Sequence, residues 1–523
     1  MATEPSPAGF VLGVDLGTSS VKVAAVGLDG AELGTAQAAY PTLTPHPGWS
    51  EQQPAAWLPA AAQAIRAAVA AAGVRPAAVR GLALAGAAHI GVLLDSAGAP
   101  LRPALLWNDQ RTGAEAAALA REAGPRILAL GRNWPSTTWT LPHLRWIAAH
   151  DPQSWRRRAG LLPSKDYLAW QLTGVRATDP ASAVSLLLCD AARADWSDEL
   201  LALADLPRSA LPPILPIGAR VGALTPQAAA LTGLPAGTPL FNGTLDSLTE
   251  TLAAGLRPGH DLLIRLATAG GIHRVGADLP PDRRLISYPY AFSDAGEGLW
   301  LQQAGTNACA SAVAWARGLL APSGAAEPDY AAWDAAAAAA PGGRDAPFFH
   351  PYLAGERAPC WSPALRGAFT GLTFRHGPAD LARAVYEGCA LSLRHALTAF
   401  LPGAVSPEIS RPMHHVPGAA PDGRVMAVGG GARSDVWCTL VAAVLGARVE
   451  AAARADSALG AARIALSGGG LGGPPAAGEA ARAVFTADEE TARTEDERFI
   501  IYRKISEHLF EISKCAIQQV KSV

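Results

Sequence analysis

A carboxylate, a glycine and three hydroxyl groups lie close together near the start of the chain, in VLGVDLGTSSVKVAAV at residues 11–26. Apolar, β-branched residues flank this polar stretch, so the pattern predicts two strands joined by a tight turn. Such a turn can hold a phosphate, because Gly17 allows close approach and the amides of Thr18 and Ser19 can donate to its oxygens. Asp15 could then hold Mg²⁺. These residue types are also ordinary turn formers, and this stretch alone leaves both interpretations open.

A similar hairpin begins half a chain later, in DLLIRLATAGGIHRV, after the break at Arg257-Pro258-Gly259. Thr18 and Thr268 occupy equivalent places in the two patterns, 250 residues apart. A motif repeated at half the chain length predicts two related domains, each opening with the same phosphate-facing turn. Two such turns facing each other across a cleft would hold opposite sides of one polyphosphate.

A third glycine-rich element is VMAVGGGARSDVW at residues 425–437. An apolar strand leads into glycines and then into a predicted helix over 435–445. A strand, a glycine turn and a helix N-terminus together can bind an anion or a nucleotide. The same pattern also suits a tight packing turn between a strand and a helix, and the sequence does not separate the two.

The remaining pattern alternates strand-like and helix-like segments, which predicts an α/β architecture. Buried strands are expected within 79–94, and helices are expected over 54–72, 113–123, 141–149 and 165–173. From about residue 495, apolar residues at helical spacing predict an amphipathic C-terminal helix.

The chain has 523 residues with 43 basic and 45 acidic side chains, a net charge of −2. This balance does not indicate nucleic acid or an anionic membrane as a partner. We find no signal-peptide pattern and no span long and apolar enough for a bilayer, so a cytoplasmic protein with free thiols at its six cysteines is expected. The pair His414-His415 lacks the spacing of a zinc motif.

Several blocks, taken in order, resemble the FGGY carbohydrate kinases of the actin-like ATPase superfamily over nearly the whole chain. They are GVDLGTSSVKV, HPGWSEQQPAAW, LRPALLWNDQRT, LLPSKDYLAWQLTG, GERAP, RGAFTGLT, RAVYEGCALSLRHAL, GGGARSDVW and ALGAARIA. Within that family, HPGWSEQQP, LLWNDQR and LLPSKDYL are most similar to xylulokinases.

This resemblance implies an α/β fold of two ribonuclease-H-like domains with a deep cleft between them. Residues 1–256 would form the sugar-binding domain and 257–494 the ATP-binding domain, with 495–523 as the amphipathic helix packed on the latter. Closure of the cleft would exclude water. Members of the family are often homodimers, so a dimer is an open expectation.

By the same resemblance, Asp246 in FNGTLDSLTETLAAG is the catalytic base that takes the proton of the sugar hydroxyl. A helix N-cap is the alternative role for an aspartate at this position. The resemblance also implies a Mg²⁺ role for Asp15. The residues implied in ATP binding are Thr18, Ser19, Thr268, Gly270, Gly430, Gly431 and Ala432. Lys22 is interpreted as a solvated charge on a strand.

For the sugar, the resemblance implies contacts from His89, Trp107 and Asp109, beside Asp246 itself. Arg111 could instead belong to a buried ion pair, and Glu356 and Arg357 are predicted to form a structural salt bridge.

Departures from the xylulokinase pattern concentrate where hydroxyls and phosphates would be bound. Ala87, Ala88 and Ile90 surround the histidine, and Ser247 follows the predicted base. Ala267 and Ala269 stand in the second turn; if residue 267 needs a positive φ, an alanine there is strained by roughly 1 kcal/mol.

The expected activity is therefore an ATP- and Mg²⁺-dependent phosphotransferase acting on a ketopentose, with D-xylulose giving D-xylulose 5-phosphate as the first expectation. A kinase for another ketose, a polyol or a sugar acid (ribulose, glycerol, erythritol or gluconate) is the alternative. An actin-like ATPase and a sugar sensor remain as expectations from other classes of protein.

Overall fold

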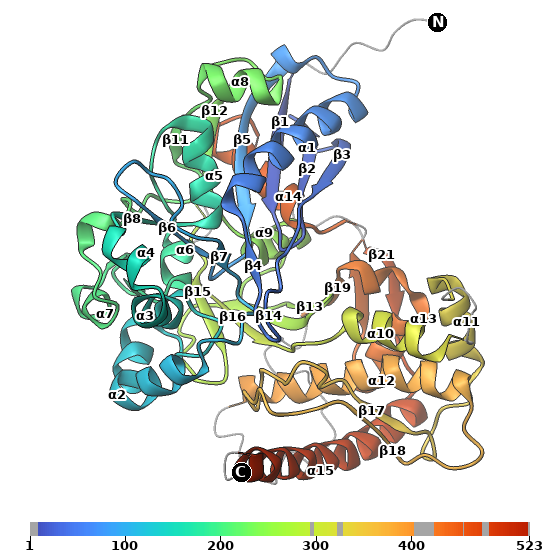
Figure 1. Cartoon of the computed structure of the whole chain (residues 1–523). Helices are drawn as coiled ribbons and strands as arrows, with labels where there is room; N and C mark the ends of the chain where they lie inside the picture. The colour runs from blue at the N-terminus through green and yellow to red at the C-terminus, as the bar shows by residue number, and fades with distance from the viewer. Residues whose placement is uncertain are drawn as a thin grey trace, which may run out of the picture.

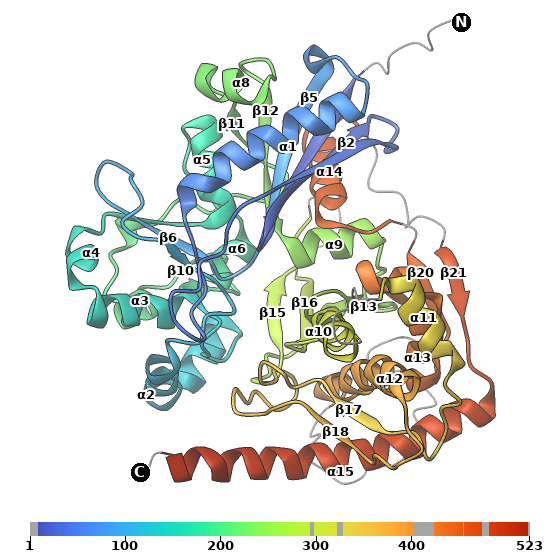
Figure 2. The same ribbon diagram turned by 45° about the vertical axis from the view of Figure 1, so that its right-hand side comes forward.

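The structure is a computed structural model, and it describes residues 9–292, 298–321, 328–401, 423–452, 454–472 and 481–520 (Figure 1). Two α/β halves lie one above the other, each built on a central mixed sheet. The N-terminal half also carries a group of helices at its side, and the C-terminal half ends in a long helix along its lower edge (Figure 2).

The first sheet has the strand order β11-β12-β5-β1-β2-β3. Its strands are β1 (Phe10–Leu16), β2 (Ser20–Gly27), β3 (Glu32–Ala39), β5 (Val79–Gly86), β11 (Arg220–Ala223) and β12 (Pro239–Leu245). Strands β1, β2 and β3 form an antiparallel meander, while β5 and β12 continue the sheet in parallel with β1. The predicted hairpin at 11–26 is confirmed, because β1 pairs with β2 across the turn at residues 17–19.

The second sheet has the order β15-β16-β14-β13-β19-β20-β21. Its strands are β13 (Leu262–Leu266), β14 (Gly270–Gly276), β15 (Ile286–Pro289), β16 (Trp300–Gly305), β19 (Val425–Val428), β20 (Val449–Ala452) and β21 (Ala481–Phe485). Here β13, β14 and β16 form the antiparallel meander, and β19 and β20 run parallel to β13. The repeated connectivity confirms the prediction of two ribonuclease-H-like halves of one α/β fold.

Helices cover the sheets, and apolar side chains fill the layers between them. Around the first sheet lie α1 (Trp57–Ala71), α5 (Ser164–Thr173) and α8 (Pro226–Thr232), and the side group contains α2 (Gly113–Gly131), α3 (Thr140–His150), α4 (Pro152–Arg157), α6 (Pro180–Ser185) and α7 (Asp198–Leu203). The second half contains α10 (Ala310–Leu320), α11 (Tyr330–Ala339), α12 (Pro378–Leu397), α13 (Asp435–Leu445) and α15 (Glu489–Val520). The tail helix therefore begins at Glu489, and its apolar residues Phe499 and Tyr502 belong to the core of the second half.

Two helices join the halves: α9 (Asp246–Ala254) and α14 (Ser457–Gly468). Figure 2 shows α9 between the two sheets, with α14 above it. Helix α14 packs on β1 so closely that a Cβ at Gly13 would lie 1.8 Å from the carbonyl oxygen of Ala458. It also crosses α9 where a Cβ at Gly460 would lie 1.9 Å from the oxygen of Thr249. Helix α14 lies within the range predicted for the ATP-binding domain, and it packs on the first sheet.

Two further observations concern the chain as a whole. None of the described helices is long and apolar enough to cross a membrane. Five cysteines are free thiols: Cys189, Cys309, Cys360, Cys389 and Cys438. His414 and His415 lie outside the described residues, as does the side chain of Cys515.

Candidate active site

A cavity of about 1910 Å³ lies between the two halves, and both hairpin turns line it. The predicted site residues in its wall are Asp15, Thr18, Ser19, His89, Trp107, Asp246, Thr268 and Gly270. Residues far apart in the sequence therefore meet in one space, with a turn from each half of the molecule.

Each turn is fixed by donors from the body of its own half. In the first turn, Thr42 Oγ1 donates to the carbonyl of Thr18 at 3.2 Å. In the second, the Cys309 amide and Ser311 Oγ donate to the carbonyl of Thr268 at 3.1 and 2.8 Å. The Thr18 hydroxyl also accepts a hydrogen bond from Trp107 Nε1 at 3.3 Å, which links the phosphate turn to the predicted sugar side.

Asp246 lies at the point where β12 ends and α9 begins, and its carboxylate is 23% exposed at the cavity wall. The helix N-cap position is Leu245, and among the described residues Asp246 Oδ1 accepts only from the amide of the next residue, Ser247, at 2.7 Å. An N-cap side chain would instead accept from an amide two or three residues on. The capping alternative is therefore not what the structure shows, and the carboxylate stays available to the cavity. Ser457 Oγ, at the start of α14, donates to the backbone oxygen of Asp246 at 3.2 Å and so helps to fix this corner.

Carboxyl groups crowd together beside the cavity, around Asp15 and Asp246. Asp15 Oδ1 is buried without a hydrogen-bond partner among the described residues. Burial, together with the neighbouring charges of Asp246 and Asp456, raises the pKa of Asp15 to about 8. Burial also raises the pKa of Glu250, one helical turn after Asp246, to about 7. A bound cation would relieve this repulsion, because it would favour the charged form of each carboxylate.

This chemistry fits Mg²⁺ at Asp15. Within the described ranges, no group of three or more ligating side chains is gathered closely enough to enclose a metal ion. Mg²⁺ commonly takes one or two carboxylates and completes its shell with water and substrate phosphates, so a single aspartate beside a phosphate turn is a suitable donor.

His89 connects the two halves at the predicted sugar side of the cavity. Its Nδ1 lies 3.1 Å from the carbonyl of Ser185, and its Nε2 lies 2.9 Å from the hydroxyl of Tyr288 on β15. Burial lowers the pKa of His89 to about 3, so the ring is neutral. A neutral imidazole fixed at both nitrogens is a rigid wall element rather than a proton carrier.

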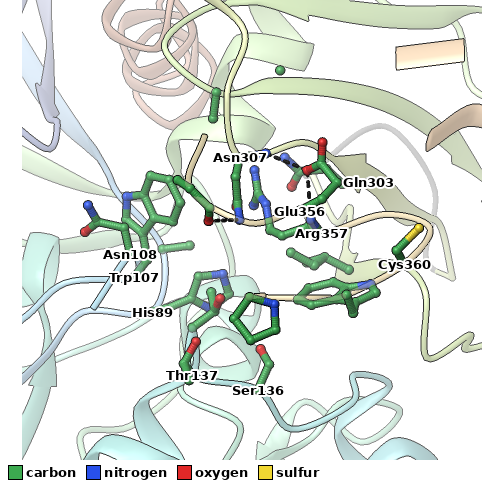
Figure 3. A pocket seen from close by; sticks show the side chains of 18 of the residues that line it. His89, Trp107, Asn108, Ser136, Thr137, Gln303, Asn307, Glu356, Arg357 and Cys360 are labelled. Carbon is green, nitrogen blue, oxygen red and sulfur yellow. Dashed lines mark hydrogen bonds between the residues drawn. The ribbon is translucent and has the colours of Figure 1, made fainter. Parts of the chain in front are cut away.

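The remaining sugar side is built from both halves (Figure 3). Trp107 and Asn108 lie to one side of His89, with Ser136 and Thr137 below it, and Arg357 faces them from the C-terminal half. The guanidinium carbon of Arg357 lies 5.4 Å from the centre of the Trp107 ring. An aromatic face beside hydroxyl and amide groups suits a polyol.

Three expectations about charged residues need correction or refinement. Asp109 is fully buried outside the cavity wall, where both its oxygens bind Arg111, so the expected sugar contact has no support. Lys22 is not merely solvated, because its Nζ lies 2.7 Å from Asp456. Glu356 does not pair with the Arg357 guanidinium; it accepts instead from the amides of Asn307 and Arg357, both at 2.8 Å.

The third glycine turn, made of Gly430, Gly431 and Ala432, is a short 3-10 turn that is not in the lining of this cavity. Its predicted contact with ATP stays a prediction. Arg482 donates to the carbonyl of Ala432 at 3.0 Å, which suits the packing-turn alternative. Ala267 does not have a positive φ, so the strain expected in the second turn is absent.

Sequence reasoning missed Arg265, Glu250 and Tyr288. Arg265 lies on β13 beside Asp246, and a charged residue inside the apolar run LLIRL was the available signal. Glu250 is one helical turn from Asp246, a spacing that places both on one side of a helix. Tyr288 meets His89 only through tertiary structure, for which the sequence offered no signal.

The fold and the cavity define a two-domain α/β protein with a large site between its halves, and comparison with known proteins gives the family. The profile described as the FGGY family of carbohydrate kinases, N-terminal domain, matches residues 10–253, and the corresponding C-terminal domain profile matches residues 271–468. The chain belongs to the FGGY family of carbohydrate kinases.

Named relatives agree with this assignment. The chain is 33% identical over 460 residues to a xylulose kinase of Escherichia coli (strain K12), covering 87% of this chain and 89% of that protein. A gluconokinase of Bacillus licheniformis is 25% identical over 457 residues, covering 84% of this chain and 83% of that protein. Among solved structures, the xylulose kinase from Rhodospirillum rubrum superposes with a TM-score of 0.82 at 32% identity, covering 97% of this chain and all of that one.

Proposed function

We propose that this sugar kinase transfers the γ-phosphate of ATP, with Mg²⁺, to a hydroxyl of a ketopentose, and that D-xylulose, giving D-xylulose 5-phosphate, is its preferred substrate. The observation that carries the proposal is the meeting of Asp246 with both hairpin turns in one cavity. The xylulose kinases among its relatives support the choice of sugar.

In this proposal each part of the cavity has a separate task. The Asp246 carboxylate accepts the proton of the attacking hydroxyl. The turns carrying Thr18 and Thr268 would hold the phosphates, and Asp15 would hold Mg²⁺, which would offset phosphate charge. His89 and Trp107 would orient the sugar, and closure of the cleft would exclude water, which otherwise competes as the acceptor.

A sugar acid such as gluconate is the second candidate. Arg357 Nε is buried without a hydrogen-bond partner among the described residues, and the guanidinium lies beside Trp107 on the sugar side. A carboxylate is the natural partner of an arginine. The small side chains of Ala87 and Ala88 also line the cavity, which leaves room for a longer substrate.

The test follows ADP release with Mg·ATP against D-xylulose, L-xylulose, D- and L-ribulose, D-fructose, glycerol, erythritol, ribitol and D-gluconate. Turnover should be highest with D-xylulose. Asp246→Asn keeps the shape of the side chain but removes its basicity, and should lower kcat by roughly 100-fold or more while changing KM little. Asp198→Asn, on the surface helix α7, is the matched control and should behave as the unmodified enzyme.

Each contrary result has a defined meaning. A preference for gluconate would replace the ketopentose with the sugar acid. ATP hydrolysis that no sugar stimulates would instead indicate an ATPase or a sensor. Full activity of Asp246→Asn would refute the role of Asp246 as base.

A further inference from the structure

Arg265 is a cation at the floor of the cavity that the proposed function does not use. It is the fourth residue of β13, just before the turn at residues 267–269, and its side chain is 26% exposed at the cavity wall. Its neighbours Ile264 and Leu266 are fully buried. A charge in a central strand is costly unless it has partners, so this position requires an explanation.

The guanidinium lies among carboxylates from the other half. Arg265 Nε is 2.8 Å from Glu250 Oε2, and Nη2 is 3.9 Å from Asp246 Oδ2. The positive charge of Arg265 lowers the pKa of Asp15, and so partly opposes the increase caused by burial and by the neighbouring carboxylates. The nearby cation Lys22 is already engaged by Asp456. Arg265 is therefore the positive charge that the site places next to the predicted base.

The hydrogen bonding of this cation is incomplete. Arg265 Nε and Glu250 Oε2 approach closely, yet neither makes a well-aligned hydrogen bond with any described residue. The distance from Nη2 to Asp246 is too long for a hydrogen bond. A guanidinium has five N–H donors, so Arg265 retains donors for a group that enters the cavity.

Its position suggests what that group is. Arg265 lines the cavity 3.9 Å from Asp246, where the hydroxyl would be activated, and three residues before Thr268, in the turn that would hold phosphate. A donor next to both of these groups would be close to a phosphoryl group in transfer. We propose that Arg265 is a further catalytic residue whose guanidinium contacts the phosphoryl group during its transfer, and that Glu250 is a positioning residue that holds the guanidinium. This rests on the proposed kinase function.

The step balances without a further reactant. The hydroxyl oxygen of the substrate forms the new bond to the γ-phosphorus, and the bond from that phosphorus to its bridging oxygen breaks, leaving the electron pair on ADP. The hydroxyl proton passes to Asp246. Arg265 neither gives nor takes a proton; it stabilises negative charge on the phosphoryl oxygens.

A purely structural ion pair between α9 and β13 is the competing explanation. Under that explanation, removing either partner should lower stability to a similar extent and affect catalysis little. Under the proposal, removing the arginine should damage the chemical step far more than removing the glutamate.

The experiment compares Arg265→Met, Arg265→Lys and Glu250→Gln in the full chain. Arg448→Met is the matched control, since Arg448 pairs with Glu450 on the same sheet and is absent from the described cavity lining. One readout is kcat and KM for the best substrate. The other is calorimetric affinity for Mg·ADP, with and without aluminium fluoride, which mimics the phosphoryl group in transfer and needs no sugar.

Arg265→Met should lower kcat by about 100- to 1000-fold, with the KM for sugar and the affinity for Mg·ADP within about threefold. It should also lose the additional affinity that aluminium fluoride confers. Compared with Arg265→Met, Arg265→Lys should keep more of kcat and more of the additional affinity that aluminium fluoride confers. Glu250→Gln should lower kcat and this affinity less than Arg265→Met does. Arg448→Met should match the unmodified chain in both.

The catalytic role of Arg265 would be overturned if Arg265→Met and Glu250→Gln lowered kcat by the same small factor and left the aluminium-fluoride-dependent binding of Mg·ADP intact. Failure of the proposed function looks different, because the unmodified chain would then phosphorylate no sugar. In that case the binding of Mg·ADP with aluminium fluoride still tests the role of Arg265. The role is overturned if Arg265→Met keeps the fluoride-dependent affinity, or if the unmodified chain shows no fluoride-dependent affinity.

Discussion

The two hairpin turns occupy equivalent places in the two halves, yet they carry opposite charges. Asp15 stands three residues before Thr18, and Arg265 stands three residues before Thr268. Both lie on the first strand of a meander, and both line the same cavity. The duplicated fold therefore supplies two similar frames, while the residue at one matched position makes one turn suitable for a cation and the other for an anion.

The same comparison extends to the strand centres. Gly13 on β1 is matched at the same offset by Leu263 on β13, and Leu263 is fully buried. Helix α14 crosses the first sheet at Gly13, and its backbone leaves no room for a side chain at that residue.

The largest effect is expected for Gly13→Ala. The new methyl group would overlap the backbone of α14, so the helix must move, and the free energy of unfolding should fall by about 3 kcal/mol or more. Denaturant unfolding measures this, with Gly113→Ala as control because no atom lies within 4 Å of a Cβ there. An equal, small change in both variants would show that α14 packs less closely than described.

Per pH unit, a smaller effect is expected from the charge of Asp15. Its pKa of about 8 lies above the ordinary value of 3.8, so between these values the folded chain holds a proton that the unfolded chain has released. The free energy of unfolding should therefore fall as pH rises through this window, by at most about 1.4 kcal/mol per pH unit from this group. Arg265 stays charged throughout and adds no such slope.

Asp15→Asn should flatten that dependence. The measurement is denaturant unfolding at several pH values from 5 to 8.5 without Mg²⁺ or nucleotide, and the control is Asp29→Asn in the surface turn after β2. The same slope in Asp15→Asn and the unmodified chain would mean that Asp15 is ionised in the folded protein.

The smallest effect is expected for Ala267→Gly. Because Ala267 does not have a positive φ, glycine relieves no strain, and the more flexible unfolded chain should cost about 0.4–1 kcal/mol of stability. The KM for ATP should stay within about twofold of its original value. A gain in stability would show that the turn was strained after all.

Local patterns predicted much of the fold. The turn residues and the alternation of apolar segments predicted both hairpins and most helices, since these depend on neighbouring residues. The packing of Ala458 against Gly13 depends on residues far apart in the chain, and no periodicity predicts it. The same limit applies to Asp109, because the sequence cannot show whether a carboxylate faces a cavity or a buried arginine.

At the site, the repeated hairpin motif predicted that the two turns would face one cavity. It did not predict that a negative charge would lie beside one turn and a positive charge beside the other. Asp15 stood out beside glycine and hydroxyls. Arg265 stood within an apolar strand, and its relation to Asp246 appears only when α9 is placed against β13. The pattern of the third glycine turn suits both a nucleotide site and a packing turn, and its contact with ATP stays a prediction.

The passage of α14 back to the first sheet also affects how the chain can be synthesised. Residues 457–468 are synthesised more than 400 residues after β1. Until then, the face of the first sheet that α14 covers stays exposed. Contacts this distant slow folding and expose apolar surface to aggregation. A truncated chain ending before α14 would therefore lack part of the apolar packing of its first sheet.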